Sequence, residues 1–254
     1  MNKTIVALSV FALAVGGVAS WVLLTRPPHE PVSKNASATN DESKPEESWR
    51  ERVKTSRDGK SPAQLADEEY ADLRDAKDRL ELIRWVAEQE WAGHKTPVLR
   101  KALVADTDEA VQLEALDKSV KLADKYGASS VAEVIRTGLS VGNVKVVQQS
   151  LREARKHPCV ELVPDLLEIA DSKAAHRFLA VDALAFTDDP RASAKVIEVA
   201  SREDGDRTER LRAIALLAKI KDPRAEELLG QLCGNSDEDI RKVAIEALVA
   251  RGSK

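Results

Sequence analysis

The sequence predicts an all-α fold, a solenoid built of stacked helical hairpins, and three observations predict it. Of the 254 residues, 43% are hydrophobic but only 4% are aromatic, a composition typical of helical proteins. The phrase Asp-Pro-Arg-Ala occurs at Asp189 and again at Asp222, 33 residues later, and this period is typical of helical repeats. No strand-like alternation or Asn-Gly hairpin turn interrupts the apolar spacing.

The chain begins with an apolar run, from Thr4 to Thr25, that contains no charged residue. At about 1.5 Å per residue, a helix of this length crosses a hydrocarbon core of about 30 Å. Because Lys3 precedes the run, we expect residues 1–25 to form a single anchor in the inner (cytoplasmic) membrane, with the repeats on the periplasmic, extracytoplasmic side. The alternative is a signal peptide cleaved near the small residues 18–20, with secretion to the periplasm.

Residues 26–60 are rich in Pro, Ser, Asn, Glu and Lys and nearly free of aliphatic side chains. Such a segment buries too little apolar surface to offset the entropy of ordering, so we expect a disordered linker. Trp49 within it is either a short docking motif or an incidental aromatic residue. Ordered structure should begin at Ser61, because Ser61 and Gln64 have the spacing of a capping box and a proline follows the serine.

Residues 61–94 precede the recognisable repeats. Their apolar positions have heptad-like spacing, and Trp85 and Trp91 lie six residues apart. We expect one or more helices that cap the N-terminal end of the solenoid, since a terminal repeat must cover an otherwise exposed core. A short coiled coil that binds a partner is the alternative.

Residues 95–254 are predicted to form about five helical hairpins. The first helices are expected near Pro97 to Ala105, Ser129 to Leu139, Pro158 to Ala170, Pro190 to Ala200 and Pro223 to Cys233. The second helices are expected at Ala110 to Val120, Val144 to Ala154, Arg177 to Thr187, Arg210 to Ile220 and Arg241 to Arg251. Proline costs little at the first helical position and Asp is favoured at the N-cap, so both Asp-Pro phrases mark helix starts.

The aligned second helices resemble HEAT repeats, which have an Asp at the turn and an Arg six residues later. Asp171 with Arg177 and Asp204 with Arg210 fit this pattern, and Asn235 with Arg241 and Asp106 with Gln112 are weaker forms. The phrase Asp-Pro-Arg-Ala is similar to the bacterial HEAT-like repeats of phycobilin lyases. The resemblance covers roughly Lys95 to Gly252. It implies a right-handed α-solenoid in which Asp171, Arg177, Asp204, Arg210 and Arg241 form a structural ladder.

The sequence offers no evident chemistry. Its four histidines have no metal-ligand spacing, and no phosphate loop or nucleophile elbow is present, so we expect no catalytic residue, metal, cofactor or small-molecule ligand. Cys159, at a helix start, is either a reactive thiol or a small buried hydrophobe. Cys233 lies two hairpins away, too far for a disulfide, so both thiols should be free. A net charge of −4 argues against nucleic-acid binding.

One line of residues on the second helices is the predicted partner-binding surface. It consists of Glu114, Gln149, Asp182, Ala215 and Glu246, which should point away from the first helices. In HEAT-like solenoids the second helices line the concave face, so the resemblance implies that this line faces the partner. Because Glu114, Asp182 and Glu246 are acidic, we expect the partner to be basic or polar there. We therefore expect a membrane-tethered scaffold for protein–protein interaction. An enzyme resembling the bilin lyases is the alternative, and a DNA-binding protein resembling HEAT-like glycosylases is the third class.

Overall fold

The computed structural model describes residues 48–54 and 59–252, which lie in one compact unit, residues 45–254. The helices are α1 (Trp49–Lys54), α2 (Pro62–Asp72), α3 (Ala76–Ala87), α4 (Pro97–Ala105), α5 (Glu109–Asp124), α6 (Ala128–Ser140), α7 (Val144–Lys156), α8 (Val163–Asp171), α9 (Arg177–Leu184), α10 (Pro190–Ser201), α11 (Arg207–Leu216), α12 (Pro223–Leu232) and α13 (Glu238–Gly252), with 3-10 turns η1 (Val160–Leu162) and η2 (Leu217–Lys219). The part of the chain that the structure describes contains no strand, which confirms the expected all-α fold.

The anchor expected within residues 1–25 lies outside the described residues. Among the helices that are described, none has both the length and the apolar character needed to cross a bilayer. Most of the expected linker, residues 26–47, also lies outside them.

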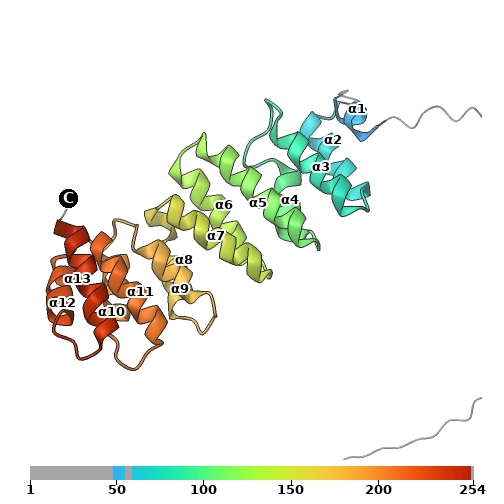
Figure 1. Ribbon diagram of the computed structural model, residues 1–254. Coiled ribbons are helices and arrows are strands. Elements are labelled where there is room, and N and C mark those ends of the chain that lie inside the picture. Colours follow the sequence, from blue (N-terminus) through green and yellow to red (C-terminus); the bar gives the residue numbers. More distant parts are fainter. Residues whose placement is uncertain (1–47, 55–58, 253–254) are drawn as a thin grey trace, which may run out of the picture. The chain divides into compact units, whose positions relative to one another are not determined.

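The helices from α2 onward pack as consecutive pairs in two layers (Figure 1). The first-helix layer contains α2, α4, α6, α8, α10 and α12, and the second-helix layer contains α3, α5, α7, α9, α11 and α13. Each helix contacts its pair partner and the helices of its own layer in the adjacent pairs, with η1 joining α6 to α8. The pair α2–α3 extends the same two-layer pattern, so residues 62–87 form a pair like those that follow them.

Local sequence chemistry explains where the helices begin. The backbone amide of Ser61 donates to Gln64 Oε1 at 2.8 Å and the Gln64 amide donates to Ser61 Oγ at 3.4 Å, so the predicted capping box is confirmed. The carboxylates of Asp189 and Asp222 each accept from the amide two residues later, at 2.8 and 2.9 Å. Both predicted N-caps are therefore confirmed, and the proline that follows each occupies the first helical position.

The expected linker, residues 26–60, ends in ordered structure, so the disorder predicted for its residues 49–54 is corrected. Residues 49–54 form α1, which packs against α2. Val53 is fully buried, and the Trp49 ring lies edge-on to Trp85 with ring centroids 5.6 Å apart. The Trp85 ring in turn lies edge-on to the Trp91 ring, with their centroids 6.3 Å apart. Trp49 and Val53 are four residues apart and share one helix face, which gives even this short helix apolar surface to bury.

A single hydrophobic core runs between the two layers, from Val53 to Ala247. Its largest fully buried side chains include Leu82, Leu116, Leu151, Leu184 and Ile214, one from each of five successive second helices. Each pair therefore buries its apolar stripe against its neighbours, and the polar side chains between adjacent pairs decide what the surface presents.

Candidate interaction groove on the second-helix layer

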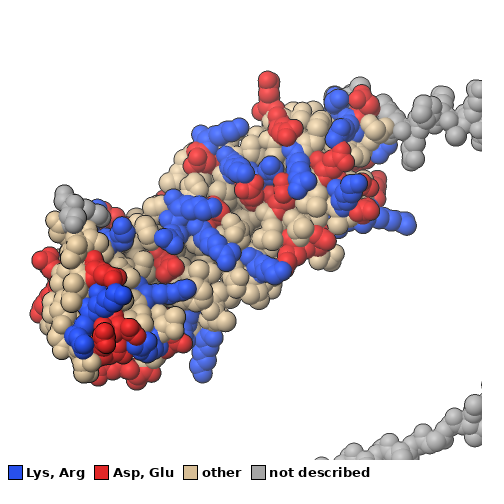
Figure 2. All heavy atoms as spheres, viewed as in Figure 1, with Lys and Arg blue, Asp and Glu red and all other residues tan. Residues whose placement is uncertain are grey.

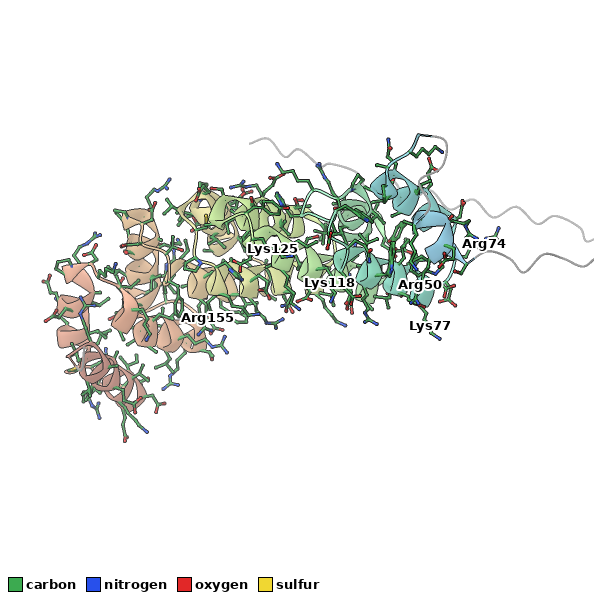
Figure 3. All side chains as sticks on the ribbon, turned by 90° about the horizontal axis from the view of Figure 1, so that it is seen from above. Arg50, Arg74, Lys77, Lys118, Lys125 and Arg155 are labelled. Carbon is green, nitrogen blue, oxygen red and sulfur yellow. The ribbon has the colours of Figure 1, made fainter. Side chains whose placement is uncertain are left out.

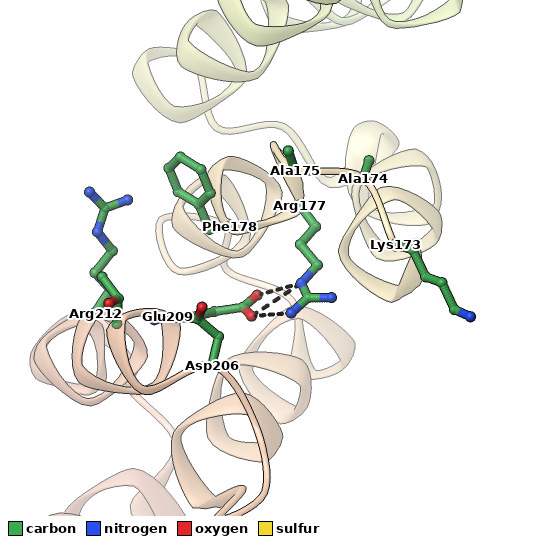
Figure 4. A pocket seen from close by; sticks show the side chains of 9 residues that line it. Lys173, Ala174, Ala175, Arg177, Phe178, Asp206, Glu209 and Arg212 are labelled. Atoms are coloured by element: carbon green, nitrogen blue, oxygen red, sulfur yellow. Dashed lines mark hydrogen bonds and ion pairs between the residues drawn. The ribbon is translucent and has the colours of Figure 1, made fainter.

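The expected ladder forms different pairs from those predicted. Arg177 does not pair with Asp171 but binds Glu209 of α11, with its Nη2 2.8 Å from Glu209 Oε2 (Figure 4). Asp171 accepts from Lys195 of α10 instead. The reason is the layering. Asp171 ends a first helix and meets the next first helix, whereas Arg177 begins a second helix and meets the next second helix.

The other two ladder arginines bind backbone carbonyls near the ends of first helices. Arg210 Nε donates to the Ala200 carbonyl at 3.2 Å, and Arg241 Nη1 donates to the carbonyls of Asn235 and Ser236 at 2.8 Å each. Asp204 is exposed, and no hydrogen bond or ion pair links it to Arg210 in the described structure. The Ala200 carbonyl is one that the end of α10 leaves without an intrahelical partner, whereas Asn235 and Ser236 lie in the turn between α12 and α13. Because Arg210 binds Ala200, its predicted pairing with Asp204 was wrong.

A ladder contact that the sequence analysis missed joins α3 to the next pair. Arg79 Nε and Nη2 donate to the two carboxylate oxygens of Asp106 at 2.8 and 3.1 Å, and the Tyr70 hydroxyl donates to the same carboxylate. Arg79 Nη1 also donates to the Leu73 and Arg74 carbonyls, as Arg241 does at its own turn. The signal was present, because Arg79 lies 33 residues before Gln112.

The predicted partner-binding residues do lie on successive second helices, but their surroundings differ from the acidic line expected. Glu114 on α5 accepts from Arg84 Nε at 2.9 Å and lies 3.6 Å from Lys118 Nζ. The hydrogen bond from Arg84 lowers the pKa of this carboxyl. Gln149 on α7 donates to Glu153 at 2.7 Å. The Glu114 carboxylate is therefore already neutralised by its neighbours.

Asp182 on α9 has a different environment from Glu114. Its side chain is partly buried and forms no hydrogen bond with any described residue. Burial raises the pKa of this carboxyl, against the opposing charges of Arg155 and Arg212. Glu246 on α13 is exposed, and Ala215 on α11 is exposed as well. Of the predicted set, Asp182 lines a hollow on the described part of the surface.

Two hollows lie on either side of α9. One, of about 450 Å³, lies against α7. The other, of about 490 Å³, lies against α11 (Figure 4). We call the surface that they form the cationic groove and define it by Arg152, Arg155, Lys156, Phe178, Leu179, Asp182 and Arg212. Figure 2 shows Lys and Arg side chains gathered over α7, the helix that supplies three of these residues.

Two arginines of the groove are supported by aromatic rings rather than by carboxylates. The Arg155 guanidinium lies 4.8 Å from the centre of the Phe186 ring, and the Arg212 guanidinium lies 4.6 Å from the centre of the Phe178 ring. Both arginines are exposed, and no described carboxylate lies within 4.0 Å of either. Figure 3 shows Arg155 among the cations of the stack. Stacking restricts each side chain while leaving the edge of its guanidinium group free to donate.

Of the two interpretations of Cys159, the structure supports the buried hydrophobe. The thiol is 7% exposed, and its Sγ lies 2.6 Å from Glu161 Oε2. Burial and the adjacent Glu161 carboxylate both raise the pKa of the thiol. Cys159 and Cys233 are both free, as predicted. Within residues 48–54 and 59–252, no group of His, Cys, Asp or Glu side chains is placed to hold a metal ion.

Comparisons with known proteins identify one part of the chain. No curated protein matches the sequence. Among solved structures, a designed armadillo repeat protein is 15% identical, with 74% of this chain and 99% of that chain covered and a TM-score of 0.40. A second, solved in complex with the peptide (KR)4, is 16% identical, with 74% and 98% covered and a TM-score of 0.42. No conclusion about function follows from either. Residues 196–254 match the family model for HEAT repeats, so the C-terminal part of this chain is similar to HEAT repeats, as its sequence indicated.

Proposed function

We propose that this protein is a helical-repeat scaffold that binds an acidic segment of a partner protein in the cationic groove. The observation that carries the proposal is the pair Arg155 and Arg212, each held over an aromatic ring and neither bound to a carboxylate of the described chain. Arginine suits this role because its planar group donates two parallel hydrogen bonds to one carboxylate.

The charge of the groove favours an acidic partner over the basic one expected from the sequence. The chain carries a net charge of −4, yet six cations and three carboxylates line the two hollows. One of these carboxylates, Glu209, is already bound by Arg177. Lys156 is partly neutralised by Glu153, whose Oε1 lies 2.8 Å from its Nζ, which leaves Arg155 and Arg212 as the freest positive charges beside Asp182. A partner carboxylate near either arginine therefore gains more electrostatic free energy than a partner ammonium near Asp182 does.

The membrane tether is part of the proposal. Residues 1–25 would anchor the chain and residues 26–47 would link the anchor to α1, with the repeats on the extracytoplasmic side. The apolar run and the lysine before it support this arrangement. A reporter that is active only in the periplasm, fused after Lys254, should be active, and the protein should resist carbonate extraction. Recovery of a soluble chain that starts near Trp21 would establish a cleaved signal peptide instead.

A fluorescent peptide of alternating Glu and Leu tests the groove. We expect saturable binding by residues 45–254, and we expect Arg155→Gln/Arg212→Gln to weaken it at least about tenfold, as the loss of charge-assisted hydrogen bonds implies. The matched control, Arg74→Gln/Lys77→Gln, removes two exposed cations from the other end of the stack (Figure 3) and should bind as the wild type does.

The same titration separates the competing classes of partner. A Lys-Leu peptide that binds more tightly than the Glu-Leu peptide would show that Asp182 rather than the arginines selects the partner. Tighter binding of single-stranded DNA than of the acidic peptide would favour a nucleic acid. Equal loss of binding in the groove variant and in the control variant would show a non-specific charge effect and would contradict the assignment of the groove.

A further inference from the structure

A third hollow, of about 310 Å³, is lined mainly by first helices, whereas second helices line most of the cationic groove. It is formed between α4 and α6 of the first-helix layer, together with the segment that precedes α4 and one residue of α5. Leu103 and Val134 supply its apolar part. Its polar lining contains His94, Lys95, Arg100, Ser119, Glu133 and Arg136.

His94 is the unusual residue of this hollow. Its side chain is 10% exposed, and neither Nδ1 nor Nε2 has a hydrogen-bond partner. The nearest carboxylate oxygen, Glu133 Oε2, is 3.9 Å from Nε2, too far for a hydrogen bond. The ring packs against Tyr126 with a centroid separation of 5.2 Å, which fixes its position. A buried polar group without a partner is costly, so folded proteins seldom leave one unless something else binds it.

Two further polar groups lining the hollow also lack partners. Ser119 on α5 is 2% exposed, and its hydroxyl forms no hydrogen bond with another described residue. Arg100 on α4 is exposed, and no described carboxylate pairs with it. By contrast, Lys95 binds Glu133 at 3.1 Å and Arg136 binds Asp165 at 3.0 Å. The unpartnered groups are thus a buried imidazole, the hydroxyl of a buried serine and an exposed guanidinium, all able to donate hydrogen bonds.

We propose that this hollow binds a small organic carboxylate. The carboxylate accepts hydrogen bonds from His94 and Ser119 and faces the positive charge of Arg100, while the carbon chain of the ligand lies against Leu103 and Val134. A few converging polar groups beside an apolar wall, in a volume near 300 Å³, are typical of small-molecule sites. The proposal does not depend on the cationic groove, which lies on the second-helix layer.

Succinate is the probe, because it carries carboxylates on a short apolar chain, and succinamide is its uncharged control. The imidazole resonances of His94 in the folded protein report binding directly. We expect succinate to shift them saturably and to raise the melting temperature, and we expect succinamide to do neither. In His94→Phe the ring remains against Tyr126 but both nitrogens are lost, so the variant should fold without loss of stability and bind succinate at least about tenfold more weakly.

Arg100→Gln, a change at an exposed residue, provides a second variant and should also weaken succinate binding. The matched control is His157→Phe, which makes the same substitution outside the hollow and should leave succinate binding unchanged. The absence of a saturable shift at His94 in the millimolar range would overturn the proposal, as would equal affinity in all three variants. If the Glu-Leu peptide shifts His94 and succinate does not, the carboxylate belongs to a partner protein, which also overturns it.

Discussion

Replacement of Arg79 by alanine should weaken the contact between the first two helix pairs. The Arg79 side chain is 13% exposed and that of Asp106 is 3% exposed, so this is a buried ion pair with two hydrogen bonds between its members. Removing one partner of a buried pair costs about 3 to 5 kcal/mol, because the other charge stays buried and unpaired. Asp106 keeps the Tyr70 hydroxyl and the Asp108 amide, so we expect a loss near the lower end, about 3 kcal/mol.

The loss of stability caused by Arg79→Ala should depend on pH, and the pKa of Asp106 determines the direction of this dependence. Burial alone would raise this pKa, but hydrogen bonds from Arg79, Tyr70 and the Asp108 amide outweigh burial and lower it. A carboxyl with a lowered pKa stabilises the fold above its unfolded pKa, and this stabilisation is lost as the pH falls through the folded pKa. The difference between the wild type and Arg79→Ala should therefore be largest at neutral pH and should shrink in acid, where Asp106 is protonated.

Urea unfolding followed by circular dichroism at pH 7 and at a series of lower pH values down to about pH 2 measures this difference. Hydrogen exchange should also show faster opening of α2 and α3, because stability in stacked repeats is local. The control Arg74→Ala changes an exposed neighbour and should cost under about 0.5 kcal/mol. An Arg79→Ala loss no larger than that of the control, or one that is unchanged in acid, would refute the reasoning.

Three further predictions test other parts of the structure. Trp49→Ala removes the ring contact with Trp85 and should destabilise α1 by about 1 to 2 kcal/mol, seen as faster tryptic cleavage between residues 50 and 54, whereas unchanged cleavage would place α1 outside the fold. Because burial and a carboxylate raise the pKa of Cys159, this thiol should react with a disulfide reagent at pH 8 more slowly than Cys233, and equal rates would contradict its burial. Asp182→Asn removes a carboxyl whose pKa is raised, so it should stabilise the fold at neutral pH, and this stabilisation should disappear in acid. The same substitution should tighten binding of the Glu-Leu peptide, and weaker binding would argue against an acidic partner.

The helix starts and the repeat period could be predicted from the sequence because the interactions that decide them are local. An N-cap carboxylate such as Asp189 or Asp222 binds an amide two residues away, and the capping box at Ser61 spans three. These contacts join residues within one helical turn of each other, so the local sequence identifies them. The linker prediction was wrong at residues 49–54 because the average composition of the segment obscured two apolar residues with helical spacing, Trp49 and Val53.

The candidate sites depended on which residues the stacking of pairs brings together. Asp182 was predicted from its position on the second helix, but nothing in the sequence showed that Arg155 and Arg212 would lie beside it, since those residues are 27 and 30 positions away in the chain. Arg177 binds Glu209 rather than Asp171 for the same reason, because the next helix in a layer lies about one repeat further along the chain. His94 belongs to no motif, so the sequence did not identify it as a candidate site residue. Its two nitrogens are buried without partners because the chain packs around them, and burial is a property of the packed chain.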